Sequence, residues 1–500
     1  MALFNKASLN NSKVFSLGKP EAEAEFNQSQ NSPSLKTIFD DTNGVIDAIA
    51  SGKFIIIGRK GAGKSAIVGY INLNAAPVDE DVYCRIIRPF DNIGNSHLVN
   101  ELGKDACEIL YQWSIISKLI EMILETKRAK YTKEISALEK FYKKYNTLFD
   151  LNHFLKDDAE IKTKISVNVL LSVFSGAFSR ERSSKQTENQ PFYTFIPGLN
   201  NVIGSIMKMD EFRDIELIVL FDDLDINFDL ANDNDRSKIL ALIRVAKDLN
   251  NDINLYGKVR ILLFLRDDVQ RKLSGQATDT SKIFGSYGFQ LKWCEAPNVP
   301  EDGAKIKSIV NKRLKYNFEL RSMSYNTYDP WRSYVVENRK GSIFKKLLDY
   351  TFYRPRDIIN LFLPLDGRNS YTLPLKKSDL KSLLKQFSEK IYEEFNDEIS
   401  IKTTRKQREL IRSLLSNIVQ RTRKQQTLTY QQLCSLIEPP LDSSIIETLY
   451  EYDVIGVIDT IGDAHFHFRY SFPTVPLSEC TFCVPNIIRL YFDRSTPIHL

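Results

Sequence analysis

Short apolar runs, each followed by polar residues, mark out the first half of the chain. Residues 54–57, 215–221 and 259–265 are almost wholly apolar and rich in Ile, Leu and Val. Runs of this length without polar alternation are typical of parallel strands buried on both faces. Residues 235–249 have helical spacing and supply a crossover between the second and third run. This order predicts a doubly wound α/β domain built on a parallel sheet.

Helical spacing dominates most of the remaining chain. Residues 100–164 predict a helical insertion, residues 165–173 alternate as a strand does, and residues 179–190 predict an exposed loop. The first 34 residues are rich in Asn, Ser, Lys and Glu and show no periodicity. We therefore expect a flexible N-terminal arm (1–34), an α/β core carrying the insertion (35–300), a helical lid (301–400) and a winged-helix-like domain (401–500).

The last hundred residues have the pattern of three helices and a hairpin. Residues 409–421 and 443–452 have helical spacing, Thr429 opens a capping box, and residues 454–459 and 465–471 predict a two-stranded wing. A winged helix often binds DNA, but acids surround its second long helix and would repel phosphate. They are Asp442, Glu447, Glu451 and Asp453. The basic residues lie near the first helix (Lys402, Arg405, Lys406, Arg408 and Arg412), so a solvated or protein-contact face and a DNA-binding face both remain open.

Composition, charge and length indicate which class of protein the chain belongs to. Its 500 residues have a net charge of +5, too small to indicate a polyanionic partner by itself, and length alone predicts two to four domains. No apolar run approaches the roughly 20 residues that span a bilayer, and the N-terminus lacks the order of a signal peptide. Six cysteines are too sparse for a disulfide framework. We expect a cytoplasmic protein without membrane contact, in which Cys480, Cys483, His465 and His467 are core and wing residues, with a zinc site as the alternative.

A phosphate-binding motif follows the first predicted strand. Residues 58–65 fit G-x-x-x-x-G-K-[ST] and precede a predicted helix over residues 66–73. Glycines let backbone N–H groups surround phosphate oxygens, and the helix directs its positive end at them. Lys64 is expected to bridge the β- and γ-phosphates, and the Ser65 hydroxyl to bind Mg²⁺. The predicted phosphate-binding residues are Gly58, Arg59, Lys60, Gly61, Ala62, Gly63, Lys64, Ser65 and Ala66. The alternative, a turn that binds nothing, is disfavoured by the flanking strand and helix.

Acidic residues end the second predicted strand as a Walker B motif does. Asp222 is placed to hold Mg²⁺, directly or through water, and Asp223 is the candidate general base for an attacking water. Solvated loop acids are the alternative for this pair. Asp225 either orients a basic group or caps the next helix.

Two arginines are candidates for contact with the γ-phosphate. Arg266 follows the third strand, where strand ends of a doubly wound sheet meet the ligand crevice. An ion pair with Asp267 or Asp268 is the alternative role for Arg266. Arg356 stands at the start of a predicted helix and is placed to reach back from the lid.

The order GRKGAGKS, LFDDLD, FLRDD and YRPRDII resembles the bacterial P-loop ATPases related to the KAP and STAND groups and to the origin-recognition ATPases of the AAA+ clade. The resemblance covers roughly residues 35–365, although Ile226 stands where KAP proteins usually have arginine. It implies ATP and Mg²⁺ as ligands, hydrolysis to ADP, Arg266 as sensor and Arg356 as lid arginine. It also implies an antiphage-defence ATPase that acts through homo-oligomerisation or a protein effector. The alternative is a DNA-binding initiator or transposition-type AAA+ ATPase.

Overall fold

The fold is taken from a computed structural model of the chain. It describes residues 15–26, 34–75, 81–88, 106–130, 132–145, 164–166, 189–224, 233–252, 255, 257–274, 279–294, 303–337, 342–366, 372–400, 403–421, 427–437, 443–458, 464–470 and 476–500. The chain forms two compact units. The sheet unit comprises Gly44–Lys60 and Lys64–Leu291, and the helical unit comprises Met1–Asn43, Gly61–Gly63 and Lys292–Leu500. The four-domain division remains a prediction.

The sheet unit is built on five parallel strands, which confirms the predicted α/β class. They are β1 (Ile55–Ile57), β2 (Val82–Ile87), β5 (Glu216–Phe221), β6 (Val259–Leu265) and β7 (Gly288–Gln290), in the spatial order β2-β5-β6-β1-β7. All neighbouring pairs are parallel. The residues of β1 are all buried, as the unbroken apolar run requires. The strand that follows the Walker B acids, β6, thus separates β5 from β1.

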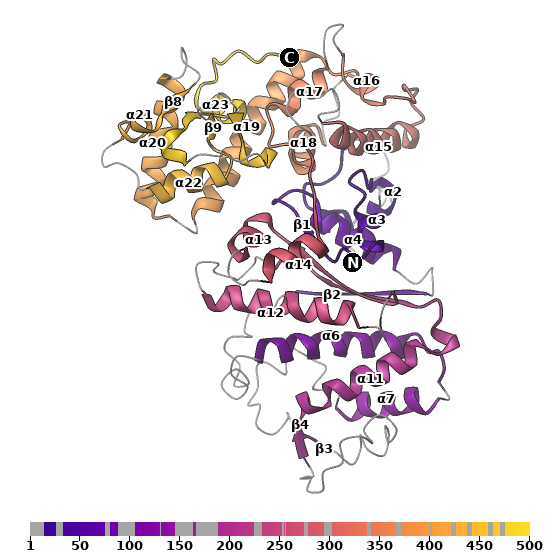
Figure 1. The fold of residues 1–500 in the computed structure, drawn as a ribbon. Coiled ribbons are helices and arrows are strands. Elements are labelled where there is room, and N and C mark those ends of the chain that lie inside the picture. Colours follow the sequence, from indigo (N-terminus) through magenta and orange to yellow (C-terminus); the bar gives the residue numbers. More distant parts are fainter. Residues whose placement is uncertain are drawn as a thin grey trace, which may run out of the picture. The chain divides into compact units, whose positions relative to one another are not determined.

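Helices cover this sheet and enlarge its core. In Figure 1, α6 and α12 lie side by side next to the sheet, where α12 packs on β6 and α6 packs on β5. The helix α4 packs on β2, and α7 and α11 pack on α6. Trp113 and Tyr111 of α6 are fully buried. The bounds are α3 (Val45–Ala50), α4 (Lys64–Asn74), α6 (Ala106–Glu125), α7 (Lys133–Lys144), η4 (Phe192–Phe195), α11 (Ile196–Met207), η5 (Asp210–Phe212), α12 (Asp233–Asn250), α13 (Asp267–Leu273) and α14 (Thr280–Tyr287).

The predicted insertion is helical where the structure describes it, in α6 and α7. The strand predicted over residues 165–173 is described only at its start. There, β3 (Lys164–Ser166) pairs antiparallel with β4 (Asn189–Pro191). Residues 167–188, which hold the rest of that strand and almost all of the predicted loop, lie outside the described residues.

The helical unit has an aromatic core. Trp331 meets Phe344 and Phe362 edge-on, and Tyr392 stacks on Tyr491. No helix within the described ranges is long and apolar enough to cross a membrane. The bounds here are α1 (Ala22–Phe26), α2 (Leu35–Ile38), α15 (Ala304–Leu320), α16 (Trp331–Tyr334), α17 (Ile343–Leu348), α18 (Pro355–Phe362), η6 (Leu363–Leu365) and α19 (Lys377–Ser400).

The expectation of a flexible arm over residues 1–34 is wrong for residues 15–26. Phe15 and Leu17 are buried, and the Phe15 ring packs against Phe318. The carboxylate of Glu25 accepts two hydrogen bonds from the buried Arg313 guanidinium, at 2.6 and 3.1 Å. These contacts fix the segment on α15. Residues 1–14 and 27–33 lie outside the described residues.

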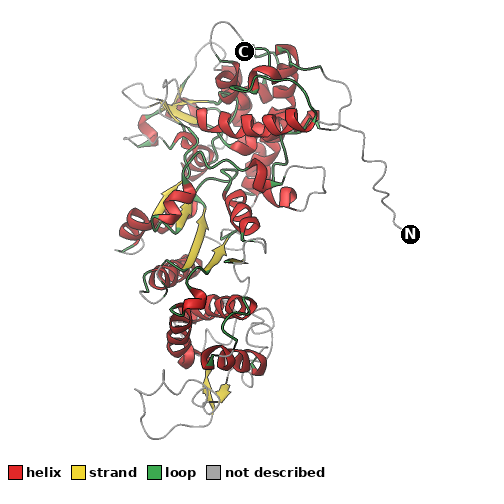
Figure 2. Ribbon diagram, turned by 90° about the vertical axis from the view of Figure 1, so that its right-hand side faces the viewer, coloured by secondary structure: helices red, strands yellow, loops and turns green. Residues whose placement is uncertain are grey.

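The end of the chain combines short helices with a four-stranded antiparallel sheet of order β10-β9-β11-β8, drawn in yellow in Figure 2. The capping box at Thr429 is confirmed. The predicted second wing strand ends early, because β10 stops at His465 and η7 follows. The winged helix therefore stays a prediction. The bounds are α20 (Arg405–Arg421), β8 (Leu428–Thr429), α21 (Tyr430–Cys434), α22 (Ser443–Glu451), β9 (Gly456–Ile458), β10 (Ala464–His465), η7 (His467–Arg469), η8 (Leu477–Glu479), β11 (Thr481–Cys483) and α23 (Asn486–Phe492).

Asp453, one of the acids expected around the second long helix, is buried instead, whereas the cysteines were expected in the core. Asp453 has a positive φ of 63° and its Oδ1 lies 3.7 Å from Nδ1 of the buried His467. It is therefore not part of an acidic face that meets solvent. Burial raises the pKa of the Cys483 thiol to about 11, and the Cys480 thiol donates to the carbonyl of Pro476. Asp442 and Lys402 lie outside the described residues.

Candidate nucleotide site

The register of the sheet unit brings the predicted strand-end residues to one edge. Ile57 of β1 pairs with Leu265 of β6, and Phe221 of β5 pairs with Leu263 of the same strand. The chain leaves β1 at Gly58, β5 at Asp222 and β6 at Arg266. Because parallel strands end on the same side, the phosphate-binding loop, the paired acids and Arg266 follow strands that end at one edge.

The loop has the backbone geometry that its glycines permit. Gly61 and Gly63 have φ values of 80° and 91°, a region that residues with a Cβ enter at a cost. Lys64 then begins α4, confirming the predicted strand, loop and helix. The first N–H groups of a helix have no partner within the helix itself, and they give its start a positive end suited to phosphate.

The side chain of Lys64, the first residue of α4, extends back to the loop. Its ammonium group donates to the carbonyls of Gly58 and Arg59 at 2.9 and 3.2 Å. Gly58 in turn donates its N–H to Leu265 of β6 at 3.1 Å, which anchors the start of the loop on the sheet. Lys60 is exposed, while Arg59 and Ala62 are buried. The loop therefore contains a fixed positive charge beside the N-terminal end of α4.

The predicted magnesium ligands lie close to each other. The Ser65 hydroxyl and the backbone N–H of Asp223 lie near enough to the Asp222 carboxylate to favour its charged form. Burial, followed by the charge of Asp223, raises the pKa of Asp222 to about 6, although these two groups and Lys64 oppose the change. Hydroxyl and carboxylate oxygens are the ligands that Mg²⁺ prefers, so Ser65 and Asp222 suit this ion.

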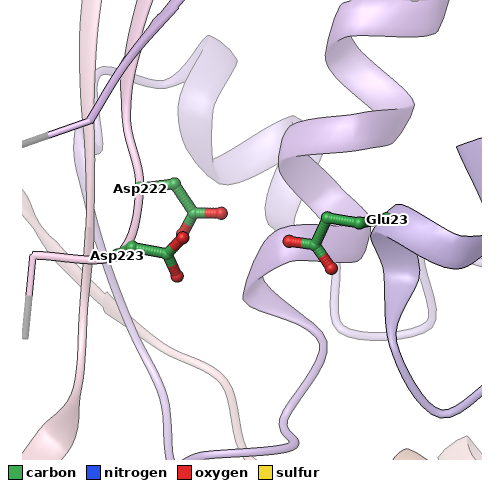
Figure 3. Close-up of side chains that lie close together, drawn as sticks. All are labelled: Glu23, Asp222 and Asp223. Carbon is green, nitrogen blue, oxygen red and sulfur yellow. The ribbon is translucent and has the colours of Figure 1, made fainter. Parts of the chain in front are cut away.

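Asp223 occupies a strained backbone position. Its φ is 57°, in the left-handed region that side chains with a Cβ rarely adopt. Strain of this kind persists where the surroundings impose it, and it is frequent at functional sites. Figure 3 shows the carboxylates of Asp222 and Asp223 at the end of β5. Glu23, also labelled there, belongs to the helical unit and is not counted in this site. Asp225 and Ile226 lie outside the described residues.

Arg266 forms the ion pair that was the alternative prediction for it. Its guanidinium donates to both carboxylate oxygens of Asp268, at 3.0 and 2.8 Å. Asp267 is buried at the first turn of α13. Two-point bonding holds the Arg266 side chain in one orientation. A role for Arg266 at phosphate remains a prediction.

The two arginines of the YRPRDII segment differ in their environment. Arg354 is buried and bonded to Asp357 of α18 at 2.8 and 2.7 Å, so it holds the helix start. Arg356 lies two residues further along the chain and donates from Nε to the backbone carbonyl of Pro20 at 3.2 Å. Within the same unit, a Cβ built on Gly61 would lie 3.3 Å from both Arg354 Cδ and Arg356 Cβ. No side chain at position 61 fits there without displacing one of them.

One contact of the phosphate-binding loop was not predicted from the sequence. The indole Nε1 of Trp293 donates to the carbonyl of Ala62 at 2.9 Å, and both residues are buried. The two positions are 231 residues apart in sequence. The only sequence signal was a tryptophan just after β7, next to the predicted boundary near residue 300.

No protein-family model matches the chain. It is similar to an Escherichia coli K12 protein named putative transposon gamma-delta 80.3 kDa protein, with 24% identity over 325 residues, which is 61% of this chain and 41% of that protein. It is also similar to Allergen Alt a 2 of Alternaria alternata, with 29% identity over 99 residues, 20% of this chain and 47% of that protein. The chain thus spans less than half the length of these curated relatives.

Two solved structures of the Aeropyrum pernix ORC2 protein are also similar to the chain. The ADP form has 11% identity and a TM-score of 0.31, covering 96% of this chain and 92% of that one. The ADPNP-ADP complexes have 10% identity and a TM-score of 0.30, covering 94% and 98%. These scores are too low to support an argument, so the fold class rests on the parallel sheet described above.

Proposed function

We propose that the chain binds ATP with Mg²⁺ and hydrolyses it to ADP and phosphate, as a nucleotide-driven switch. The observation that carries the proposal is the proximity of Ser65 in the loop to Asp222 after β5, close enough for the hydroxyl to lower the pKa of the Asp222 carboxyl. It joins the two parts of a magnesium site that are 157 positions apart in the chain. The buried Asp222, the positive φ of Asp223 and the Lys64 ammonium at the loop support the same conclusion.

Each residue then has a defined task in hydrolysis. The loop N–H groups and Lys64 would bind the β- and γ-phosphates, and Ser65 and Asp222 would hold Mg²⁺, which would neutralise charge on the phosphate oxygens. Asp223 orients a water molecule and accepts its proton as the water oxygen attacks the γ-phosphorus. The bond from that phosphorus to the β–γ bridging oxygen breaks. Arg266 and Arg356 are proposed to contact the γ-phosphate.

Two substitutions separate binding from hydrolysis. Lys64→Ala should abolish ATP binding measured by calorimetry, because it removes the charge that faces the phosphates. Asp223→Asn should retain binding and lose phosphate release. Lys140→Ala on α7, an exposed lysine, is the matched control and should behave as the parent protein. Absence of ATP binding by the parent chain, or full binding by Lys64→Ala, would contradict the proposal.

A role in mobile DNA is the second candidate, favoured by the similarity to the transposon protein. The basic residues of α20 are the candidate DNA contacts, although Arg405 already pairs with Glu409 and Arg408 donates to the carbonyl of Thr403. Changing Arg405, Lys406 and Arg408 to Gln together should weaken salt-dependent binding of duplex DNA. If the parent chain does not retain DNA at low salt, this role is excluded.

The antiphage setting rests on the family resemblance alone. We infer that ATP would there promote self-association or the capture of a protein effector. Sedimentation of the Asp223→Asn protein with and without Mg²⁺–ATP tests self-association, because this variant should hold its nucleotide unhydrolysed. An unchanged sedimentation coefficient would leave only the effector route.

A further inference from the structure

The tip of the phosphate-binding loop is held by a side chain outside the motif. Trp293 donates its indole N–H to the carbonyl of Ala62 at 2.9 Å. Ala62 is 2% exposed and Trp293 is 9% exposed, so water does not compete freely for this bond. It is a hydrogen bond between a side chain and the backbone of the loop itself.

The position of this carbonyl decides where the next N–H group points. A peptide unit is planar and trans, so the carbonyl of Ala62 and the N–H of Gly63 point in opposite directions. Gly63, at a φ of 91°, supplies one of the two torsions that turn this peptide, so the peptide has few steric restraints on that side. Fixing the carbonyl therefore fixes the N–H of Gly63, one of the donors that a loop of this sequence offers to phosphate.

Trp293 is itself restrained by its neighbours in the helical unit. The thiol of Cys294 donates to the carbonyl of Phe468 at 3.6 Å, and the Lys292 ammonium lies 5.9 Å from the centre of the Tyr470 ring. The Phe468 ring stacks on Tyr353, the residue before Arg354. The segment that carries the indole is thus attached on both sides to the turn around η7.

We propose that Trp293 is a positioning residue of the nucleotide site, which keeps the Ala62–Gly63 peptide turned so that Gly63 offers its N–H to a phosphate. This inference rests on the proposed ATP binding. Without the indole N–H the peptide samples other orientations, and the measured dissociation constant rises in inverse proportion to the competent fraction. A competent fraction of about one tenth corresponds to an affinity loss of about tenfold.

The test is Mg²⁺–ATP binding by Trp293→Phe, which keeps an aromatic ring and removes the donor. Trp331→Phe is the matched control, because Trp331 in the same unit donates its own indole N–H to Glu337 at 2.7 Å. We expect about tenfold weaker binding of ATP by Trp293→Phe, with the melting temperature of the nucleotide-free protein close to that of the control. If Trp293 only stabilised the fold, Trp293→Phe would lower the melting temperature together with the ATP affinity, or would change neither.

The outcomes distinguish the positioning role of Trp293 from the proposed binding of ATP. If the parent protein binds ATP and both variants match it, the positioning role is wrong and the proposed function stands. If the parent protein does not bind ATP, the proposed function fails first. Should Trp293→Phe fail to fold, the variant with both Trp113→Phe and Trp331→Phe keeps Trp293 as its sole tryptophan. Its emission should change on addition of Mg²⁺–ATP, and an unchanged spectrum would refute the role.

Discussion

Asp222→Asn should make the protein more stable while abolishing the proposed ATP hydrolysis. The Asp222 side chain is almost fully buried, and burial with the charge of Asp223 raises its pKa from 3.8 to about 6. A carboxyl group with a raised pKa binds its proton more tightly in the folded chain than in the unfolded chain. Its ionisation above pH 6 therefore opposes folding. An amide of the same shape removes this cost.

The size and pH dependence of the effect follow from the shift. A change of about two pKa units corresponds to about 3 kcal/mol, which is an upper limit for the gain at neutral pH. Asparagine interacts with the Ser65 hydroxyl and the Asp223 N–H less strongly than a carboxylate does, so we expect about 1 to 2 kcal/mol. The unfolded state loses its proton near pH 4 and the folded state near pH 6. The advantage of Asp222→Asn over the parent chain should thus grow across this window and stay constant above it.

Thermal unfolding followed by far-UV circular dichroism measures this difference. For a unit of this size, about 1 to 2 kcal/mol raises the melting temperature by roughly 2 to 8 °C at pH 8, and the gap should close by about pH 4. Asp223→Asn is the second variant to measure. It removes the charge of Asp223, one cause of the raised pKa of Asp222, and should move the pH range in which the Asp222 carboxyl titrates to lower pH. If Asp222→Asn is less stable than the parent chain at pH 8, or the gap does not change with pH, the electrostatic argument is wrong.

Two further substitutions test the loop and the N-terminal segment. Gly61→Ala places a Cβ at a φ of 80° and 3.3 Å from two arginines, so it should cost about 1 to 2 kcal/mol in thermal unfolding and weaken ATP binding. Gly52→Ala, at a φ of 95° with no neighbour within 4 Å, should cost stability alone, and equal ATP affinity of the two variants would contradict this reasoning. Glu25→Ala should destabilise the protein to urea by about 3 to 5 kcal/mol, because it leaves the buried Arg313 charge uncompensated. Replacing Glu25 by Leu together with Arg313 by Met should restore much of that loss, and no recovery would mean that the pair is not the cause.

The sheet and the phosphate-binding loop could be predicted because their signals are local. A strand buried on both faces needs an unbroken apolar run, so β5 and β6 are visible in a window of a few residues. The loop is contiguous, and its glycines at positions 61 and 63 are required by positive φ values. The order of the strands in space is not local, and only the structure showed that β6 lies between β5 and β1.

Features that depend on distant partners were missed. Residues 15–26 have the composition of a flexible arm, but Glu25 pairs with Arg313, 288 positions away, and Phe15 packs on Phe318. His467 similarly faces the buried Asp453, in a turn where alternation predicted a strand. Patterns within a short window contain no record of such partners, so they cannot distinguish a packed segment from a solvated one.

Three arginines, Arg266, Arg354 and Arg356, differ in the groups that already bind their side chains. If Arg354 moved away from Asp357, the fully buried Asp357 carboxylate would lose the positive charge that compensates it. Arg266 would give up two charge-assisted bonds to Asp268 in order to bind phosphate. Arg356 donates from Nε to the neutral carbonyl of Pro20, and a phosphate oxygen is a stronger acceptor than a peptide carbonyl. Arg356 would therefore give up the least on binding a phosphate, which makes it the best candidate of the three for the proposed γ-phosphate contact.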